Sequence, residues 1–327
     1  MQPSVSAQPS VSVAIPVFNE EAVVGDLLRR LGAVLDTLPA PRSGASHEIV
    51  IVDDGSSDRT AEALRRLSAG DHRLVVIELS RNFGHQAAMS AALDNTTGDV
   101  VVMMDGDLQD APEAIPRFLE EHAKGFEVVY ARRVGRKEGW PRRLAYFLFY
   151  RLIRSLSRFP LPLDSGDFCL VSRQVATQMS QMPERHRYLR GLRSWVGFRQ
   201  TAIDVEREAR VAGTTKYTLS KLLRLAFDGI FSFSTLPLRV ATFIGFLAML
   251  ASGLFASYAI YARLFLDRSP AGFTALLVAI VFLFGVQFLM FGILGEYVGR
   301  IYDETKARPR YIVRQITGQQ PPETADG

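Results

Sequence analysis

The sequence predicts an α/β protein with a largely parallel sheet, followed by two helices long enough to cross a membrane. The first prediction rests on short apolar runs that alternate with amphipathic runs before about Pro237. The second rests on two uncharged segments, 240–262 and 271–295. Each exceeds the roughly 20 apolar residues that a spanning helix needs. A pair of buried core helices is the alternative interpretation, but core helices this long and apolar are uncommon.

Charge and cysteine content exclude several classes of protein. The net charge of +4 over 327 residues is too small to indicate nucleic-acid binding. The single cysteine, Cys169, excludes an internal disulfide and a cysteine-based zinc site, so we expect it to pack in the core. The first ten residues are polar and no apolar signal-peptide core follows, so we expect the N-terminal domain to stay in the cytosol.

Apolar and amphipathic runs of the sequence predict the elements of the sheet domain. Strands are expected at 11–15, 48–52, 74–79, 100–104 and 127–131, with helices at 21–38 and 86–95 and a loop at 39–46. Ser57 or Asp58 can cap the helix that follows the second strand. No Gly-x-Gly-x-x-Gly follows the first strand and no Gly-Lys-Ser/Thr loop is present, which argues against a dinucleotide oxidoreductase or a P-loop enzyme.

Acidic residues follow three of these strands. Glu20 lies just beyond the first strand, Asp53 and Asp54 follow the second, and Asp105 and Asp107 follow the fourth. Ligands of open α/β sheets bind beyond the carboxyl ends of the strands. We therefore expect the three acidic clusters to converge on one edge of the sheet.

The triplet Asp105-Gly106-Asp107 is the motif that indicates a function most specifically. Two carboxylates at this spacing, on a turn after a buried strand, can present oxygen atoms to Mg²⁺ or Mn²⁺. Gln109 could supply a further oxygen. An isolated Asp-x-Asp triplet is often only a solvated turn, but its position after Val-Val-Val-Met-Met favours a metal site.

Two other segments have both a structural and a functional interpretation. Asp53-Asp54 can serve turn and cap chemistry, or accept hydrogen bonds from a nucleoside base or ribose. Arg81 can be a solvated charge or meet phosphate, and His85 is a possible base. The residues alone leave these alternatives open.

Together these motifs resemble the family-2 glycosyltransferases of GT-A fold, from about Val11 to Val313. The first half carries the resemblance at 15–20, 52–58, 80–84 and 105–110. The second half resembles the polyprenyl-phosphate branch, at 165–168, 190–198, 213–217, 226–238, 294–302 and 307–311. Bacterial two-span enzymes that make undecaprenyl-phosphate-glucose are the most similar subgroup.

The resemblance implies a role for each matching residue on the donor side. Pro16 and Glu20 would line the nucleoside pocket, and Asp54, beside Asp53, would bind uracil or ribose of a UDP-sugar. Arg81 would contribute to the same nucleotide-sugar site.

The resemblance also implies the metal and acceptor residues. Asp107 and Gln109 would hold Mg²⁺ or Mn²⁺, and Asp105 would reach the donor sugar or the metal through water. Asp167 would be a catalytic base or would position the acceptor phosphate, with a helix or turn cap as the structural alternative. Phosphate groups would meet two further residues that might otherwise be surface charges: Arg210 and Lys216.

The domain organisation follows from hydropathy and charge. We expect a cytoplasmic GT-A domain at 1–216, a juxtamembrane amphipathic helix at 217–239, two spans within 240–295 and a basic cytoplasmic tail at 296–327. Segments 140–159 and 217–233 are typical of basic interfacial helices, although ordinary surface helices are the alternative. The plasma membrane is the expected location, and the resemblance implies an oligomer, with a tetramer as one form.

The expected reaction is a single displacement that inverts the anomeric centre. The acceptor phosphate is already ionised near neutral pH, so a strong general base is not required. The resemblance implies glucose as the sugar, whereas the motifs themselves leave mannose, N-acetylhexosamine and aminoarabinose open. A processive polysaccharide synthase fits less well, because Arg190–Trp195 only distorts the Gln-x-x-Arg-Trp signature and two spans are too few for a pore. The non-enzyme alternative is a scaffold that has lost catalysis.

Overall fold

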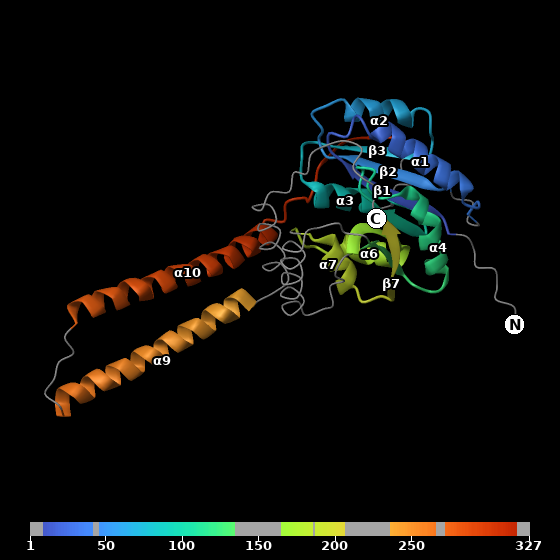
Figure 1. Cartoon of the computed structure of the whole chain (residues 1–327). Helices are drawn as coiled ribbons and strands as arrows, with labels where there is room; N and C mark the ends of the chain where they lie inside the picture. Colours follow the sequence, from blue (N-terminus) through green and yellow to red (C-terminus); the bar gives the residue numbers. More distant parts are fainter. Residues whose placement is uncertain are drawn as a thin grey trace, which may run out of the picture. The chain divides into compact units, whose positions relative to one another are not determined.

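The computed structural model describes residues 9–41, 46–134, 165–185, 187–206, 236–265 and 272–318. The chain divides into two compact units. The first comprises 1–150, 159–216 and 308–327, and the second comprises 151–158 and 217–307. Figure 1 shows the sheet and its covering helices in the first unit and the long helices α9 and α10 in the second.

The first unit is built on one sheet with the strand order β7-β5-β6-β4-β1-β2-β3-β8. Strands β4, β1, β2 and β3 run parallel, as do β5 and β7, whereas β6 and β8 are antiparallel to their neighbours. The predicted α/β class with a mostly parallel sheet is therefore confirmed. The strands are β1 (Val11–Val17), β2 (Glu48–Asp53), β3 (Leu74–Leu79), β4 (Val100–Met103), β5 (Val128–Val134), β6 (Ser165–Ser172), β7 (Gln200–Glu206) and β8 (Val313–Thr317).

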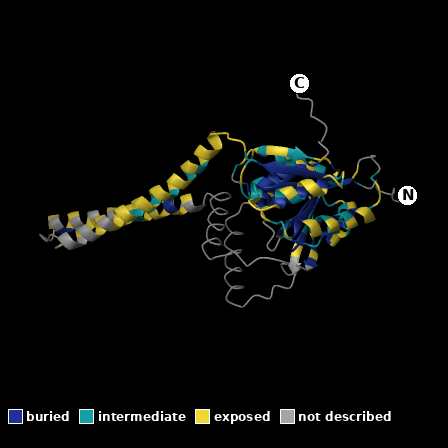
Figure 2. Cartoon of the chain, turned by 90° about the horizontal axis from the view of Figure 1, so that it is seen from above, coloured by how far each residue is buried: buried dark blue, intermediate teal, exposed yellow. Residues whose placement is uncertain are grey.

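Helices cover both faces of this sheet. Alternate residues of β1 belong to two different core clusters, with Val13 and Ile15 in one and Ala14 in the other. The first cluster includes residues of α1 (Val24–Thr37), α2 (Thr60–Ser68) and α4 (Ile115–Ala123). The second includes residues of α3 (His85–Asp94), α6 (Arg173–Gln181) and α7 (Leu189–Trp195). In Figure 2 the strands are buried between these two layers, as strands covered on both faces must be.

The elements agree with the sequence prediction in the first half of the chain. All five predicted strands and both predicted helices exist, with ends that differ by a few residues. Cys169 is fully buried in the core, as expected. Of the two predicted capping residues, Asp58 binds the start of α2, although α2 begins at Thr60 and Arg59 at the N-cap position makes no side-chain cap bond. The Asp58 carboxylate accepts a 3.0 Å hydrogen bond from the N–H group of Thr60.

The second unit contains α9 (Leu236–Phe265) and α10 (Phe273–Thr305). Each is long and apolar enough to cross a membrane, over Val240–Ala262 and Phe282–Thr305. Only 6% of the first window and none of the second is buried by protein, which disfavours the core-helix alternative. Most residues of both helices whose burial is described are exposed (Figure 2), and many of these residues are large and apolar.

The end of the chain differs from the expected tail. Helix α10 continues past residue 295 to Thr305, and residues 313–317 form β8 at the edge of the sheet beside β3. The sequence predicted a basic tail here because of Arg308, Arg310 and Arg314, and this short strand was not predicted.

Candidate active site

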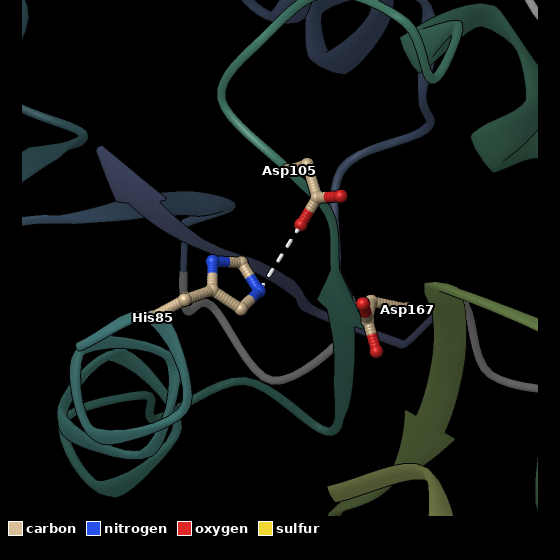
Figure 3. Close-up of side chains that lie close together, drawn as sticks. All are labelled: His85, Asp105 and Asp167. Carbon is tan, nitrogen blue, oxygen red and sulfur yellow. Dashed lines mark ion pairs between the residues drawn. The ribbon is translucent and has the colours of Figure 1, made fainter. Parts of the chain in front are cut away.

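The core of the candidate site lies where β4 and β6 meet. Met103 pairs with Cys169 in the antiparallel ladder, and two further residues along each strand bring Asp105 opposite Asp167. His85, the first residue of α3, completes the group (Figure 3). Donor atoms of His85, Asp105 and Asp167 all lie within 4.8 Å of one another. His85 Nε2 is 3.4 Å from Asp105 Oδ1.

Arg190, from α7, holds the Asp167 carboxylate in a fork. Its Nε and Nη2 atoms donate to Oδ1 and Oδ2, each at 2.6 Å. Burial alone would raise the pKa of Asp167, but the hydrogen bonds and charge of Arg190 outweigh it and lower the pKa to about 2. The hydrogen bonds and charge of Asp167 in turn raise the pKa of Arg190, although burial opposes this shift. Asp167 is therefore a fixed carboxylate and a weak base.

Asp105 has the opposite electrostatic environment. Burial raises its pKa, the negative charges of Asp167 and Asp107 add to that shift, and His85 and Arg190 oppose it. Its Oδ1 atom is buried and has no hydrogen-bond partner among the described residues. A cation beside Asp105 would relieve both the repulsion and the unsatisfied oxygen. The oxygen-rich donor set fits Mg²⁺ or Mn²⁺.

Of the three predicted metal ligands, only Asp105 belongs to this closest group. Asp107 Oδ1 accepts a 3.1 Å hydrogen bond from the N–H group of Gln109, so these two residues share one turn. Leu108, between them, has φ of 56° and a buried side chain in the core. A bulky residue in this left-handed conformation is rare and persists only where the surroundings enforce it, which is typical of functional sites.

Gly106 allows this turn to approach the end of β1. A Cβ atom on Gly106 would lie 2.6 Å from Val17 Cγ1 and 3.0 Å from the carbonyl oxygen of Pro16. The close approach places the turn 105–109, here named the acidic turn, directly against buried Pro16. Pro16 is the residue expected in the nucleoside pocket. Sequence reasoning assigned the glycine no role.

Asp53 and Asp54, expected at the nucleoside, are both only 3% exposed. Asp53 accepts hydrogen bonds from the N–H and hydroxyl groups of Ser56. Asp54 accepts from the N–H groups of Phe83 at 2.7 Å and Gly84 at 2.9 Å. Burial raises the pKa of both carboxyls, and these hydrogen bonds oppose the rise. The two side chains therefore organise the loops after β2 and β3 from within.

The remaining residues expected at the donor lie on the loops after β1 and β3. The N–H group of Glu20 donates to Thr60 Oγ1 at 2.9 Å, which joins the end of β1 to the start of α2. Arg81 stacks over the Phe83 ring with 4.0 Å from the guanidinium carbon to the ring centroid. Arg210 and Lys216 lie outside the described residues, as do the segments 140–159 and most of 217–239.

Sequence reasoning missed the parts of the site that the tertiary fold creates. Arg190 was named only as part of a motif of the family resemblance, with no role assigned to it. His85 was considered only as a possible base, and a lone histidine is weak evidence for that role. Gln86 was not considered, yet its Oε1 accepts a 2.9 Å hydrogen bond from the N–H group of Leu189. This bond joins the residue after His85 to the residue before Arg190. No local pattern signals such a contact between α3 and α7.

The match to known families decides the class of protein. The family model described as glycosyl transferase family 2 matches residues 12–179, which contain Asp105 and Asp167. The chain belongs to glycosyl transferase family 2. It is therefore an enzyme that transfers sugars, and the resemblance stated from the sequence, including its GT-A fold, is confirmed.

Relatives of this glycosyltransferase match along nearly the whole chain. It is 42% identical to the uncharacterized glycosyltransferase YkcC of Bacillus subtilis, over 94% of each chain. It is 39% identical to the bactoprenol glucosyl transferase of Shigella phage SfX, over 93% of this chain and 98% of the phage protein. It is 36% identical to the prophage bactoprenol glucosyl transferase homolog of Escherichia coli, over 94% and 99%.

Proposed function

We propose that this glycosyltransferase moves one glucose from UDP-glucose to the phosphate of undecaprenyl phosphate. The observation that carries the proposal is the Asp105–Asp167 cluster in a chain whose relatives named bactoprenol glucosyl transferase match over nearly their full length. The match covers 305 of the 327 residues, and the unmatched remainder is shorter than either α9 or α10. The match therefore includes at least part of both helices. Both helices suit an enzyme whose acceptor resides in a bilayer.

The donor occupies the pocket formed by the loops after β1, β2 and β3. Pro16 and Glu20 line the nucleoside, Asp53 and Asp54 shape the base and ribose site, and Arg81 meets the diphosphate. The support is their convergence on one edge of the sheet, where α/β proteins bind ligands.

The acidic turn would hold a divalent cation, Mg²⁺ or Mn²⁺. Asp105 and Asp107 would supply carboxylate oxygens and Gln109 an amide oxygen. Asp167 is the less suitable ligand, since both its oxygens already accept hydrogen bonds from Arg190. A cation bound there would neutralise the negative charge that develops on the departing UDP.

The reaction is a single displacement. A phosphate oxygen of the lipid forms a bond to the anomeric carbon while the bond from that carbon to the UDP oxygen breaks, and UDP leaves with the electron pair. Asp167 positions the acceptor and does not act as a base. The support is its pKa of about 2, which makes it too weakly basic to remove a proton near neutral pH. Inversion at the anomeric carbon follows from one displacement.

The protein sits in the plasma membrane with its catalytic domain and chain end in the cytoplasm. Helices α9 and α10 form the anchoring hairpin, and segments 140–159 and 217–239 lie at the interface. Arg210 and Lys216 contact the phosphates of donor or acceptor. The enzyme works as an oligomer, with a tetramer as the expected form.

The test is transfer by the purified protein in Mg²⁺ with undecaprenyl phosphate and a panel of nucleotide sugars. The expected product is undecaprenyl phosphate carrying a single hexose, identified by its mass, with UDP-glucose as the best donor. A polymer would refute the one-sugar reaction, and a different preferred donor would refute glucose. Retention of the anomeric configuration, measured by NMR, would refute the single displacement.

A further inference from the structure

The chain that follows α10 returns to the catalytic domain beside the loop that ends β3. Residues 310–314, here named the return segment, include the first two residues of β8, which pairs antiparallel with β3. Tyr311, Val313 and Phe83 all pack against the same core cluster. The segment is thus built into the domain and is not a free tail.

A β-bulge lies where the return segment enters the sheet. Gln315 pairs with Glu78 and Val313 pairs with Leu79, so Arg314 is the extra residue of the bulge. A bulge changes the direction in which the side chain of the inserted residue points. Bulges are also frequent beside active sites. Arg314 Nη2 donates to the carbonyl oxygen of Ser80 at 3.1 Å.

Ser80 is held by the return segment through both of its backbone groups. Besides accepting from Arg314, it donates its N–H group to the carbonyl oxygen of Ile312 at 2.9 Å. Ser80 begins the loop 80–84, here named the donor loop. The far end of that loop is held by Asp54, which accepts from the N–H groups of Phe83 and Gly84. The donor loop is therefore fixed from two sides, by β2 and by the chain that leaves α10.

The return segment also fixes the helix that follows the donor loop. The Tyr311 hydroxyl donates to Asp94 Oδ2 at 3.0 Å, at the last residue of α3. Arg310 Nη2 lies 3.7 Å from the same oxygen and donates to the carbonyl oxygen of Ser180 at 3.2 Å. The first residue of α3 is His85, 3.4 Å from Asp105. One segment thus holds both the start of the donor loop and the distant end of α3.

We propose that the return segment positions the donor loop for the nucleotide sugar, with Arg314 as the positioning residue. The inference rests on the proposed function, in which Arg81 and Asp54 serve the donor. Its consequence is that donor affinity depends on residues that follow the membrane helices in the chain. The basic residues of the return segment then have a role in the catalytic domain, in addition to favouring the cytoplasmic side of the membrane.

The experiment compares steady-state kinetics of full-length Arg314→Ala with wild type. We expect the KM for the UDP-sugar to rise about three- to tenfold, the equivalent of one lost hydrogen bond. The KM for undecaprenyl phosphate and the unfolding temperature should stay unchanged. Arg314→Lys retains a donor and should recover most of the affinity. Gln315→Ala is the matched control, because its side chain donates to Thr317 within the same strand.

Each outcome decides the inference. An unchanged donor KM in Arg314→Ala, or a loss of thermal stability without a change in donor KM, would overturn it. Failure of wild type to transfer from any UDP-sugar would instead refute the proposed function. UDP titration by calorimetry in Mg²⁺ then still compares the two proteins, and equal affinities, or no binding to either, would overturn the positioning role.

Discussion

Arg190 binds both oxygens of the Asp167 carboxylate, with two hydrogen bonds of 2.6 Å that join α7 to β6. A bidentate fork of this kind fixes the orientation of both side chains as well as their charge. Because Asp105 lies directly beside Asp167, the fork also determines how much negative charge faces the candidate metal site. The pair is therefore the structural centre of the candidate active site.

Loss of Arg190 should destabilise the catalytic domain. Arg190→Met leaves the charge of Asp167 largely buried and without its partner, which costs on the order of 3 kcal/mol. Thermal unfolding should show a clearly lower transition temperature. Arg132→Met is the matched control, since it removes an equally bidentate partner of Asp204 from an exposed pair and should change little. Equal shifts in the two variants would contradict the central role of the fork.

The contribution of this pair to stability should depend on pH in one direction. The folded-state pKa of Asp167 is about 2, below the ordinary value near 3.8. A lowered pKa stabilises the fold fully above the ordinary value, and this stabilisation is lost as the pH falls towards the folded-state value. The difference in unfolding temperature between wild type and Arg190→Met should thus be largest near neutral pH and narrow as the pH falls, because burial raises the pKa of the unpartnered Asp167 in the variant and wild type loses the contribution of the pair between about pH 4 and pH 2. A difference that widens in acid would contradict this assignment.

Gly106 should not tolerate a side chain. In Gly106→Ala the new methyl group would overlap Val17 and the Pro16 carbonyl, so the acidic turn must move away from β1. We expect transfer activity to fall at least tenfold, as misplacement of about 1 Å can cost more than that. Gly25→Ala is the control, because no atom lies within 4 Å of its added Cβ in α1 and alanine favours helix. Normal activity in Gly106→Ala would show that this contact does not position the turn.

Gln86 should act on catalysis through its hydrogen bond to Leu189. Gln86→Leu removes the acceptor and leaves an N–H group at the start of α7 without this partner, at a cost of about 1–3 kcal/mol. Because Arg190 follows Leu189, we expect kcat to fall while the KM for the UDP-sugar changes little. Gln86→Glu keeps an acceptor oxygen and should retain more activity than Gln86→Leu. A raised donor KM with unchanged kcat would contradict this role.

The fold could be predicted largely from the first half of the sequence because its parallel strands are buried on both faces. Such strands appear as continuous runs of β-branched residues, as at residues 49–52 of β2 and residues 100–102 of β4. The acidic clusters follow directly from the ends of these strands. Strand β8 could not be predicted, since its Arg314 and Gln315 belong to an exposed edge with little hydrophobic signal.

The candidate site was only partly predictable for a related reason. Asp105 and Asp167 lie far apart in the sequence, and their proximity depends on the antiparallel register of β4 and β6. The fork from Arg190 depends in turn on where α7 packs. Such contacts are set by tertiary packing, whereas the sequence pattern reports mainly local structure and burial.

The most direct test of the account is lipid product formation by wild type and Asp107→Ala, purified side by side in Mg²⁺ with UDP-glucose and undecaprenyl phosphate. Asp204→Ala, which removes an exposed carboxylate of β7, is the control. Wild type and the control should form undecaprenyl phosphate carrying one glucose, and EDTA should abolish that product. Asp107→Ala should insert normally and form none. Turnover by Asp107→Ala at the wild-type rate, or by wild type in EDTA, would contradict metal-dependent transfer at this site.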